Sequence, residues 1–271
     1  MLNVFGGHGF VGSNYVKRYP TRFVNSKDDY QAEPGIDILY FISTVDNYNV
    51  FTDLHIDIDT NLNVLMSVLE SIADPTTVTF NFVSSWFVYG NSNVPAKETD
   101  PCHPRGFYSI TKHTAEQLLI SYCETMGMKY RILRLANVLG PTDDKVSKKK
   151  NALQYIIGQL KSNEKVELYN GGNFIRDYIY VDDCVDAIDL ILRTGEVNTI
   201  YNVGNGVPLS FVELVTIARD MVGSTSDIVS IEPPPFHKVV QVDSMYLDTA
   251  KLQSLGYRPT YSVEGMVQQI I

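Results

Sequence analysis

The sequence has 271 residues, enough for a sizeable hydrophobic core in one elaborated domain or in two closely packed lobes. Lys and Arg number 22 against 31 Asp and Glu, and the net charge of −9 argues against a nucleic-acid partner or an anionic membrane surface. No stretch is long and apolar enough to span a membrane, and the sequence starts directly with a predicted strand, so we expect no signal peptide and a cytoplasmic protein. Three scattered cysteines without metal-ligand spacing predict a reduced compartment and no metal site: Cys102, Cys123 and Cys184.

The first predicted elements are an apolar strand over 2–5, a glycine-rich turn over 6–12 and a helix over 13–19. This order is typical of a site for a dinucleotide. The glycines at 6, 9 and 12 allow a tight turn and a close approach to a pyrophosphate, and the amides at the helix start face the anion. We therefore predict that the chain opens with a dinucleotide-binding unit.

The end of the second predicted strand, 22–25, leaves the choice of cofactor open. A carboxylate at this point would accept a hydrogen bond from the free 2′-hydroxyl of the NAD ribose. The sequence instead has Asn25 and Lys27, which suit the 2′-phosphate of NADP, followed by Asp28 and Asp29, which could still reach a ribose. The same residues also suit a plain turn. The prediction is therefore NAD or NADP.

Two further apolar runs, 36–42 and 78–83, have the composition of buried parallel strands. Hydroxyl side chains follow each of them: Ser43 and Thr44 after the first, and Ser84 and Ser85 after the second. Because parallel strands end at the same edge of a sheet, we expect these hydroxyls to lie near one another. A helix starts near 59–61 and runs to 69.

A phenol and an ammonium stand four residues apart in the next predicted helix, at Tyr108 and Lys112. Residues at this spacing share a helical face. A free phenol has a pKa of about 10, and we expect the nearby ammonium to lower it and make Tyr108 a proton shuttle. A hydroxyl close to Tyr108, with Ser85 as the candidate, could bind the same substrate oxygen.

The remainder of the chain alternates strands and helices without an internal repeat or a flexible linker. The run at 143–150 is the sharpest local concentration of charge and, with Lys148–Lys150, is either a solvated loop or a lid for an anionic substrate. The other predicted elements are strands over 130–135, 166–169 and 199–203, a turn and edge strand over 171–178, and helices over 151–160, from 182, over 211–221 and over 263–271.

With these elements placed, the chain resembles the extended short-chain dehydrogenase/reductases, the group of nucleotide-sugar epimerases and dehydratases, over essentially its full length. Five ordered motifs carry the resemblance: 6–12 (GGHGFVG), 84–90 (SSWFVYG), 134–141 (RLANVLGP), 176–183 (RDYIYVDD) and 248–251 (DTAK) with 255–259 (LGYRP). The resemblance implies an α/β fold with a Rossmann-type doubly wound parallel sheet over 1–140, which also receives 178–205. A smaller carboxyl-terminal substrate-binding lobe is expected over 141–271. It also implies a homodimer formed by the helices over 61–69 and 108–122.

The resemblance assigns roles to individual residues. The catalytic residues would be Ser85, Tyr108 and Lys112. The cofactor would be held by Gly6, Gly9, Phe10, Val11, Gly12, Asn25, Ile42, Ser43, Thr44, Asn61, Tyr108 and Lys112. The substrate, a nucleotide-diphosphate sugar, would contact Ser85, Asn137, Arg176 and Lys238, with His237 as the alternative to Lys238. An arginine suits a diphosphate because it makes bidentate, charge-assisted contacts, although Arg176 could equally form a structural ion pair with the adjacent Asp177.

Three departures from the family pattern qualify this reading. The segment between Val24 and Ile36 is short, so part of one strand–helix unit is expected to be missing. The strand end 41–44 reads FIST where the family usually has His-x-Ala-Ala. Trp86 and Phe87 follow Ser85 at the position where the dehydratases of this family carry a Thr-Asp-Glu motif, so we do not expect elimination of water. The resemblance thus implies a C4-type epimerase working through a transient keto sugar, with an NADPH-dependent 4-keto reductase as the alternative and a non-catalytic dinucleotide sensor as a more distant one.

Overall fold

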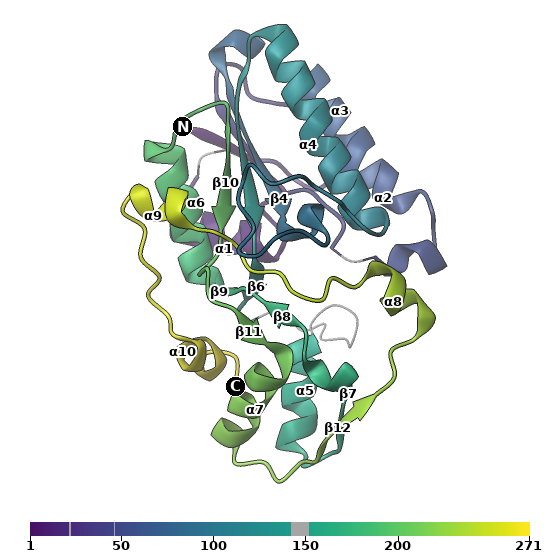
Figure 1. Ribbon diagram of the computed structural model, residues 1–271. Coiled ribbons are helices and arrows are strands. Elements are labelled where there is room, and N and C mark those ends of the chain that lie inside the picture. Colours follow the sequence, from purple (N-terminus) through teal and green to yellow (C-terminus); the bar gives the residue numbers. More distant parts are fainter. Residues whose placement is uncertain (22, 46, 142–151) are drawn as a thin grey trace.

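The computed structural model describes residues 1–21, 23–45, 47–141 and 152–271. The predicted lid at 143–150 lies outside these residues. The described chain forms two lobes, with the larger one in the upper part of Figure 1 and the smaller one below it. No helix within the described ranges has the length and hydropathy needed to cross a membrane.

A six-stranded sheet forms the centre of the larger lobe, with the strand order β10-β5-β4-β3-β1-β2. Every neighbouring pair in it is parallel. Its strands are β1 (Leu2–Phe5), β2 (Phe23–Val24), β3 (Asp37–Tyr40), β4 (Thr79–Ser85), β5 (Lys129–Leu135) and β10 (Thr199–Val203). The apolar runs of the sequence form these strands because a parallel sheet is covered on both faces.

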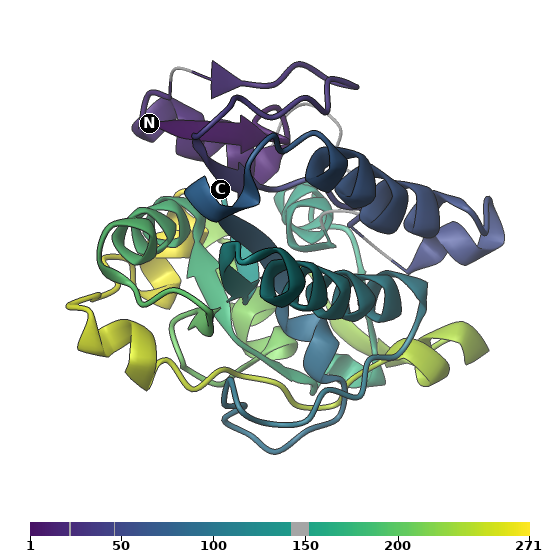
Figure 2. The same ribbon diagram turned by 90° about the horizontal axis from the view of Figure 1, so that it is seen from above.

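Helices cover both faces of this sheet, so the predicted doubly wound fold is confirmed (Figure 2). One face carries α1 (Phe10–Arg18) and α6 (Val181–Thr194), and the other carries α3 (Val64–Glu70) and α4 (Phe107–Met126). Short helical segments precede α3 without a break, namely α2 (Ile56–Ile58) and the π-helical turn η2 (Asp59–Asn63). The described part of this lobe also contains the 3₁₀ turns η1 (Tyr48–Phe51), η3 (Pro75–Thr77) and η4 (Trp86–Tyr89).

The predicted shortening of the fold lies between β2 and β3, where residues 25–36 contain no helix or strand. In the standard dinucleotide-binding order another strand lies outside the second one, whereas β2 is the edge of this sheet. The connection is held by polar contacts in place of a helix. The side chain of Asn3 bonds Asn25, its Oδ1 accepts from the amide of Glu33 at 3.0 Å, and the Ser71 hydroxyl accepts from the amide of Ala32 at 2.9 Å.

The described part of the smaller lobe has its own hydrophobic core and three two-stranded sheets. The strands pair as β6 (Asn137–Leu139) with β9 (Tyr178–Tyr180), β7 (Val166–Tyr169) with β12 (Ile228–Ile231), and β8 (Ile175–Arg176) with β11 (Leu209–Ser210). The lobe also contains η5 (Asn170–Gly172) and the helices α5 (Ala152–Lys161), α7 (Phe211–Val222) and α10 (Val263–Gln268). Ser210 and Glu213 form a reciprocal capping box that fixes the start of α7.

The chain passes between the lobes more than once. After α8 (Pro235–Val240) it returns to the larger lobe, where Val242, Met245 and Leu247 are buried in the core on the α1 and α6 side of the sheet. It then forms α9 (Ala250–Ser254) and ends at α10 in the smaller lobe (Figure 1). Because the chain after α8 crosses from lobe to lobe, the surface between the lobes is fixed by contacts between residues that are far apart in the sequence.

Candidate active site

Two predicted catalytic residues meet where the end of β4, which carries Ser85, faces the first turn of α4, which carries Tyr108. The hydroxyls of Ser85 and Ser43 lie near the Tyr108 phenol and act to lower its pKa. Ser85 Oγ also accepts the amide N–H of Phe87 at 3.3 Å. The Phe87 ring lies edge-on to Tyr108, with 5.9 Å between ring centroids. The phenol is thus bordered by two hydroxyls and an aromatic ring.

Lys112 lies deeper on the same helical face and is only 2% exposed. Its ammonium donates to the Val83 carbonyl over 2.7 Å and lies 4.1 Å from the centroid of the Phe82 ring. Burial lowers the pKa of Lys112 to about 7, and the charge of Glu116 acts in the opposite direction.

The predicted effect of Lys112 on Tyr108 is wrong for this arrangement. The pKa of Tyr108 is raised above its ordinary value, chiefly by burial, and the charge of Asp57 adds to the increase. The two serine hydroxyls lower it, because hydroxyl groups near the phenol stabilise its ionised form. The Lys112 ammonium is directed to the Val83 carbonyl, so the hydroxyls are the groups that favour the phenolate here.

A buried ion pair fixes α4 to the sheet one turn beyond Lys112. The Glu116 carboxylate accepts two hydrogen bonds from Arg134 on β5, at 2.7 and 3.1 Å, and a third from the Ser84 hydroxyl. Glu116 is fully buried, and so is nearly all of Arg134. Ser84 is adjacent to Ser85 in β4. The pair therefore joins the helix that carries Tyr108 to the strand that carries Ser85.

The end of β3 forms a second polar group against α4. The Oδ1 atom of Asn61 accepts from the Ser43 hydroxyl at 3.1 Å and from the Thr44 amide at 2.9 Å, while its Nδ2 donates to the hydroxyls of Thr44 and Thr111. The Thr44 hydroxyl donates in turn to Asp57. Sequence reasoning missed Asp57, although its position one helical turn before Asn61 is a signal that they share a face.

The glycine turn fits the pyrophosphate of a dinucleotide. Gly6 has a positive φ of 77°, and a Cβ on Gly12 would lie 2.4 Å from the Gly6 carbonyl oxygen, so both positions need glycine for the turn itself. A Cβ on Gly9 would meet no protein atom closer than 3.5 Å, which leaves room for a ligand at this point. Gly9 caps α1 without a side-chain acceptor, so the helix start keeps amide donors for an anion. Phe10 and Val11 form the first turn of that helix, three residues earlier than predicted.

Ile42 and Asn25, the two remaining residues that we predicted to bind the cofactor, make contacts within the protein itself. Ile42 is half-buried and packs against the core on the α3 side of the sheet. Asn25 is 9% exposed, and its amide is used within the short connection, where Nδ2 donates to the Gln31 carbonyl at 2.9 Å and Oδ1 accepts from Asn3. A contact of Asn25 with an adenosine ribose stays a prediction.

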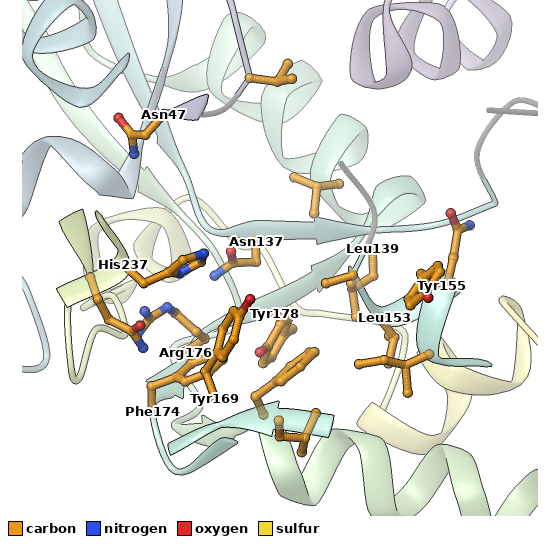
Figure 3. Close-up of a pocket in the computed structure, with 18 of the residues that line it drawn as sticks. Asn47, Asn137, Leu139, Leu153, Tyr155, Tyr169, Phe174, Arg176, Tyr178 and His237 are labelled. Carbon is orange, nitrogen blue, oxygen red and sulfur yellow. The ribbon is translucent and has the colours of Figure 1, made fainter. Parts of the chain in front are cut away.

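A cavity of about 790 Å³ lies between the two lobes and reaches Tyr108. Figure 3 shows most of its labelled residues in two groups, with Asn47 apart from both. Asn137, Tyr169, Phe174, Arg176, Tyr178 and His237 gather at one end, and Leu139, Leu153 and Tyr155 lie at the other. Phe10, Trp86 and Phe87 also line it. The size lies within the range of ordinary small-molecule sites.

Arg176 is the buried cation of this cavity. Its guanidinium lies 4.9 Å from the centroid of the Trp86 ring and 4.8 Å from that of Phe174, and it donates to the Ile175 carbonyl at 2.7 Å. Among the described residues it has no salt bridge to a carboxylate. Burial lowers the pKa of Arg176 to about 10. A buried guanidinium of this kind is suited to a ligand anion.

The adjacent Asp177 is not the partner of Arg176, which answers the alternative left open by the sequence. Its carboxylate accepts backbone amides of Asn205, Gly206 and Leu247 at 2.9 to 3.3 Å. Burial raises its pKa to about 7. Asn137 lies beside this point, and its side-chain amide donates to the Asp177 carbonyl at 3.0 Å. Asp177 thus joins separate segments around the cavity.

Of the two alternatives on α8, His237 lines the cavity, whereas Lys238 does not and pairs with Glu232 at the surface. The imidazole of His237 is hydrogen-bonded to the Tyr48 hydroxyl and lies 4.7 Å from Tyr169 between ring centroids. Burial lowers the pKa of His237. The packing of Tyr48 and Tyr169 around α8, which sequence spacing did not reveal, decides which residue faces the cavity.

Comparisons with known proteins agree with this architecture. The model of the NAD dependent epimerase/dehydratase family matches residues 28–204. The low-salt glycan biosynthesis protein Agl12 of Haloferax volcanii is 28% identical over 99% of this chain and 96% of its own. A putative UDP-glucose 4-epimerase of Methanocaldococcus jannaschii is 26% identical over 100% and 97%.

Solved structures share the fold at lower identity. The UDP-glucose 4-epimerase of Thermotoga maritima, determined with UDP-glucose, has a TM-score of 0.84 and 23% identity over 99% of this chain and 97% of the other. The UDP-N-acetylglucosamine 4-epimerase of Methanobrevibacter ruminantium has a TM-score of 0.85 and 21% identity over 99% and 96%. Taken with the family match over more than half of its length, these findings mean that the chain belongs to the NAD-dependent epimerase/dehydratase family, the extended short-chain dehydrogenase/reductases that its motifs resemble.

Proposed function

We propose that the protein is an NAD(P)-dependent epimerase that inverts C4 of a nucleotide-diphosphate sugar through a transient keto sugar. The observation that carries the proposal is the position of Tyr108, which borders the cavity and lies near the Ser85 hydroxyl. In this scheme Tyr108 takes the proton of the C4 hydroxyl and later returns it. Ser85 hydrogen-bonds the same substrate oxygen. The nicotinamide, when bound, supplies the hydride acceptor and donor.

The charges of the cavity support a diphosphate substrate. Arg176 is buried and makes no salt bridge within the described residues, and an anion with several oxygens would satisfy its planar set of donors. Asn137 and His237 line the same end of the cavity and would contribute neutral hydrogen bonds. Relatives act on UDP sugars by name, so UDP sugars are the first substrates to test.

The residues after Ser85 favour epimerisation over dehydration. Removal of water from the sugar needs an acid and a base in addition to the tyrosine, and Trp86 and Phe87 can provide neither. Both rings line the cavity, where they stack on each other with 3.9 Å between centroids. A reductase that uses NADPH is the second candidate, favoured by Asn25 and Lys27 at the end of β2. In either case Lys112 is expected to hold the nicotinamide ribose.

Replacement of the phenol tests this proposal. Tyr108→Phe removes the proton donor and acceptor but keeps the ring, and we expect turnover of a UDP sugar to fall by about 100-fold or more. The matched control is Tyr122→Phe on the same helix, because the Tyr122 hydroxyl contacts the Leu69 carbonyl and no cavity residue. If Tyr108→Phe keeps the turnover of the parent, Tyr108 is not the proton shuttle. If the parent binds dinucleotide but converts no sugar, the sensor is favoured.

A further inference from the structure

We propose that the rings of Trp86 and Phe87 form a wall along the sugar subsite and that this aromatic wall selects a nucleotide sugar that is uncharged next to C4. The inference rests on the proposed function, because it names the class of sugar that the same site accepts. The two residues directly follow Ser85, and both line the cavity. They lack the acid and base that dehydration needs, and the surface that they offer instead is apolar.

The aromatic wall reaches from the candidate diphosphate contact to the candidate proton shuttle. The Arg176 guanidinium lies 4.9 Å from the centroid of the Trp86 ring. Trp86 and Phe87 stack with 3.9 Å between ring centroids, and the Phe87 ring lies edge-on to Tyr108 with 5.9 Å between centroids and 83° between planes. In the proposed substrate the sugar ring joins the diphosphate to C4. With the diphosphate at Arg176 and C4 at Tyr108, the sugar therefore lies along the aromatic wall.

Local contacts hold this wall in place. Trp86 and Phe87 open the 3₁₀ turn η4, where Ser85 Oγ accepts the amide N–H of Phe87 at 3.3 Å. At the end of the same turn, the Tyr89 hydroxyl donates to the buried Asn202 at 2.7 Å. Trp86 itself is only 3% exposed. We therefore expect the aromatic wall to keep its shape when a ligand enters.

The proposed reaction brings both sides of C4 against the aromatic wall. Because inversion requires C4 to be oxidised from one face and reduced from the other, the sugar must turn over between the two steps. The C3 side and the C5 side of the ring then exchange places beside Phe87. C–H groups and a hydroxymethyl group can pack there. A carboxylate at C6 would lose water without gaining a charged partner, since the single indole N–H of Trp86 cannot balance a full charge.

The charges around the cavity do not offset such a carboxylate. Lys165 lines the cavity but is paired with Glu167 at 2.7 Å, and Arg176 is taken by the diphosphate. Asp57 is 1% exposed, and its charge raises the pKa of Tyr108. The same charge would repel a carboxylate bound beside Tyr108. A neutral sugar meets none of these costs.

The test uses Trp86 as its own probe, because it is the only tryptophan of the chain. The parent, with oxidised cofactor present, is titrated with UDP, UDP-glucose and UDP-glucuronic acid while the tryptophan emission is recorded. We expect UDP-glucose to change the emission more than UDP does, since its sugar lies on the ring. UDP-glucose should also bind about tenfold or more tightly than UDP-glucuronic acid.

Two substitutions at one position separate the aromatic wall from the general effect of the net charge. Phe87→Thr supplies a hydroxyl donor, and the preference for UDP-glucose should shrink about tenfold. Phe87→Leu is the matched control, because it keeps the wall apolar and should keep the preference of the parent. Both variants should bind UDP as the parent does, which shows that the rest of the site is intact. An unchanged preference in Phe87→Thr would overturn the role of the wall.

Failure of this inference and failure of the proposed function give different results. A parent that epimerises UDP-glucose and UDP-glucuronic acid equally well would overturn the selection by the wall and leave the proposed function standing. A parent that binds UDP-glucose in preference, loses that preference in Phe87→Thr and converts neither sugar would support the wall and contradict the proposed function.

Discussion

Lys112 holds its charge in an environment that disfavours it. The side chain is enclosed between α4 and β4, with the Val83 carbonyl as its hydrogen-bond acceptor. Burial moves its pKa from an ordinary value of 10.5 to about 7. A lysine in this state gives up its proton easily near neutral pH, so both the stability of the protein and the charge beside Tyr108 should depend on pH in this range.

We predict that Lys112→Met removes a pH-dependent part of the stability. Between about pH 7 and 10.5 the unfolded state keeps the lysine proton that the folded state releases. The free energy of unfolding of the parent should therefore rise with pH relative to the variant, by up to about 1.4 kcal/mol per pH unit. Urea unfolding of both proteins at several pH values measures this, and subtraction cancels the other titrating groups. A difference that stays constant with pH would contradict the assignment.

At the scale of elements, α4 has two faces with different tasks. Tyr108, Lys112 and Glu116 lie one turn apart on the face that packs against the sheet. On the outer face Ile110 is 47% exposed and Leu118 is 41% exposed. Ile58, in the helical stretch that precedes α3, is 40% exposed. We propose that this outer face packs against the same face of a second copy, as the sequence resemblance implies.

A charge placed in this face should separate the copies. We predict that the parent sediments as a dimer and that Leu118→Glu sediments as a monomer, because the interface would have to bury an unpaired carboxylate. Met221→Glu on α7 is the matched control, since Met221 is a similarly exposed apolar residue (38%) in the smaller lobe. Sedimentation velocity at equal concentrations gives the answer. A monomeric parent, or a dimer that survives Leu118→Glu, would exclude this interface.

At the scale of the whole molecule, the sequence predicted the features that depend on local pattern. Apolar runs identified the buried strands, since a parallel sheet covered on both faces leaves little room for polar residues. The short segment after Val24 predicted the missing strand–helix unit, because a dozen residues cannot hold a helix and a strand with their turns. The five motifs predicted the family correctly.

The sequence could not predict what depends on packing between distant segments. The choice between His237 and Lys238 is made by Tyr48 and Tyr169, which come from other parts of the chain. Lys112 shares a helical face with Tyr108, as the spacing requires, but its ammonium donates a hydrogen bond to the Val83 carbonyl. Asp57 reaches the site through Thr44. Spacing along one helix gives a direction and not a hydrogen-bond partner, so these contacts needed the structure.

In the proposed reaction, the cavity between the lobes takes a nucleotide sugar whose C4 is oxidised beside Tyr108 and then reduced on its other face. The most direct measurement follows UDP-glucose deuterated at C4, with a trace of NAD(P), by proton NMR. We predict that both C4 epimers form, that deuterium stays on C4 in each, and that no cofactor is consumed. Stoichiometric consumption of NADPH with no inversion at C4, or loss of water from the sugar, would contradict this account.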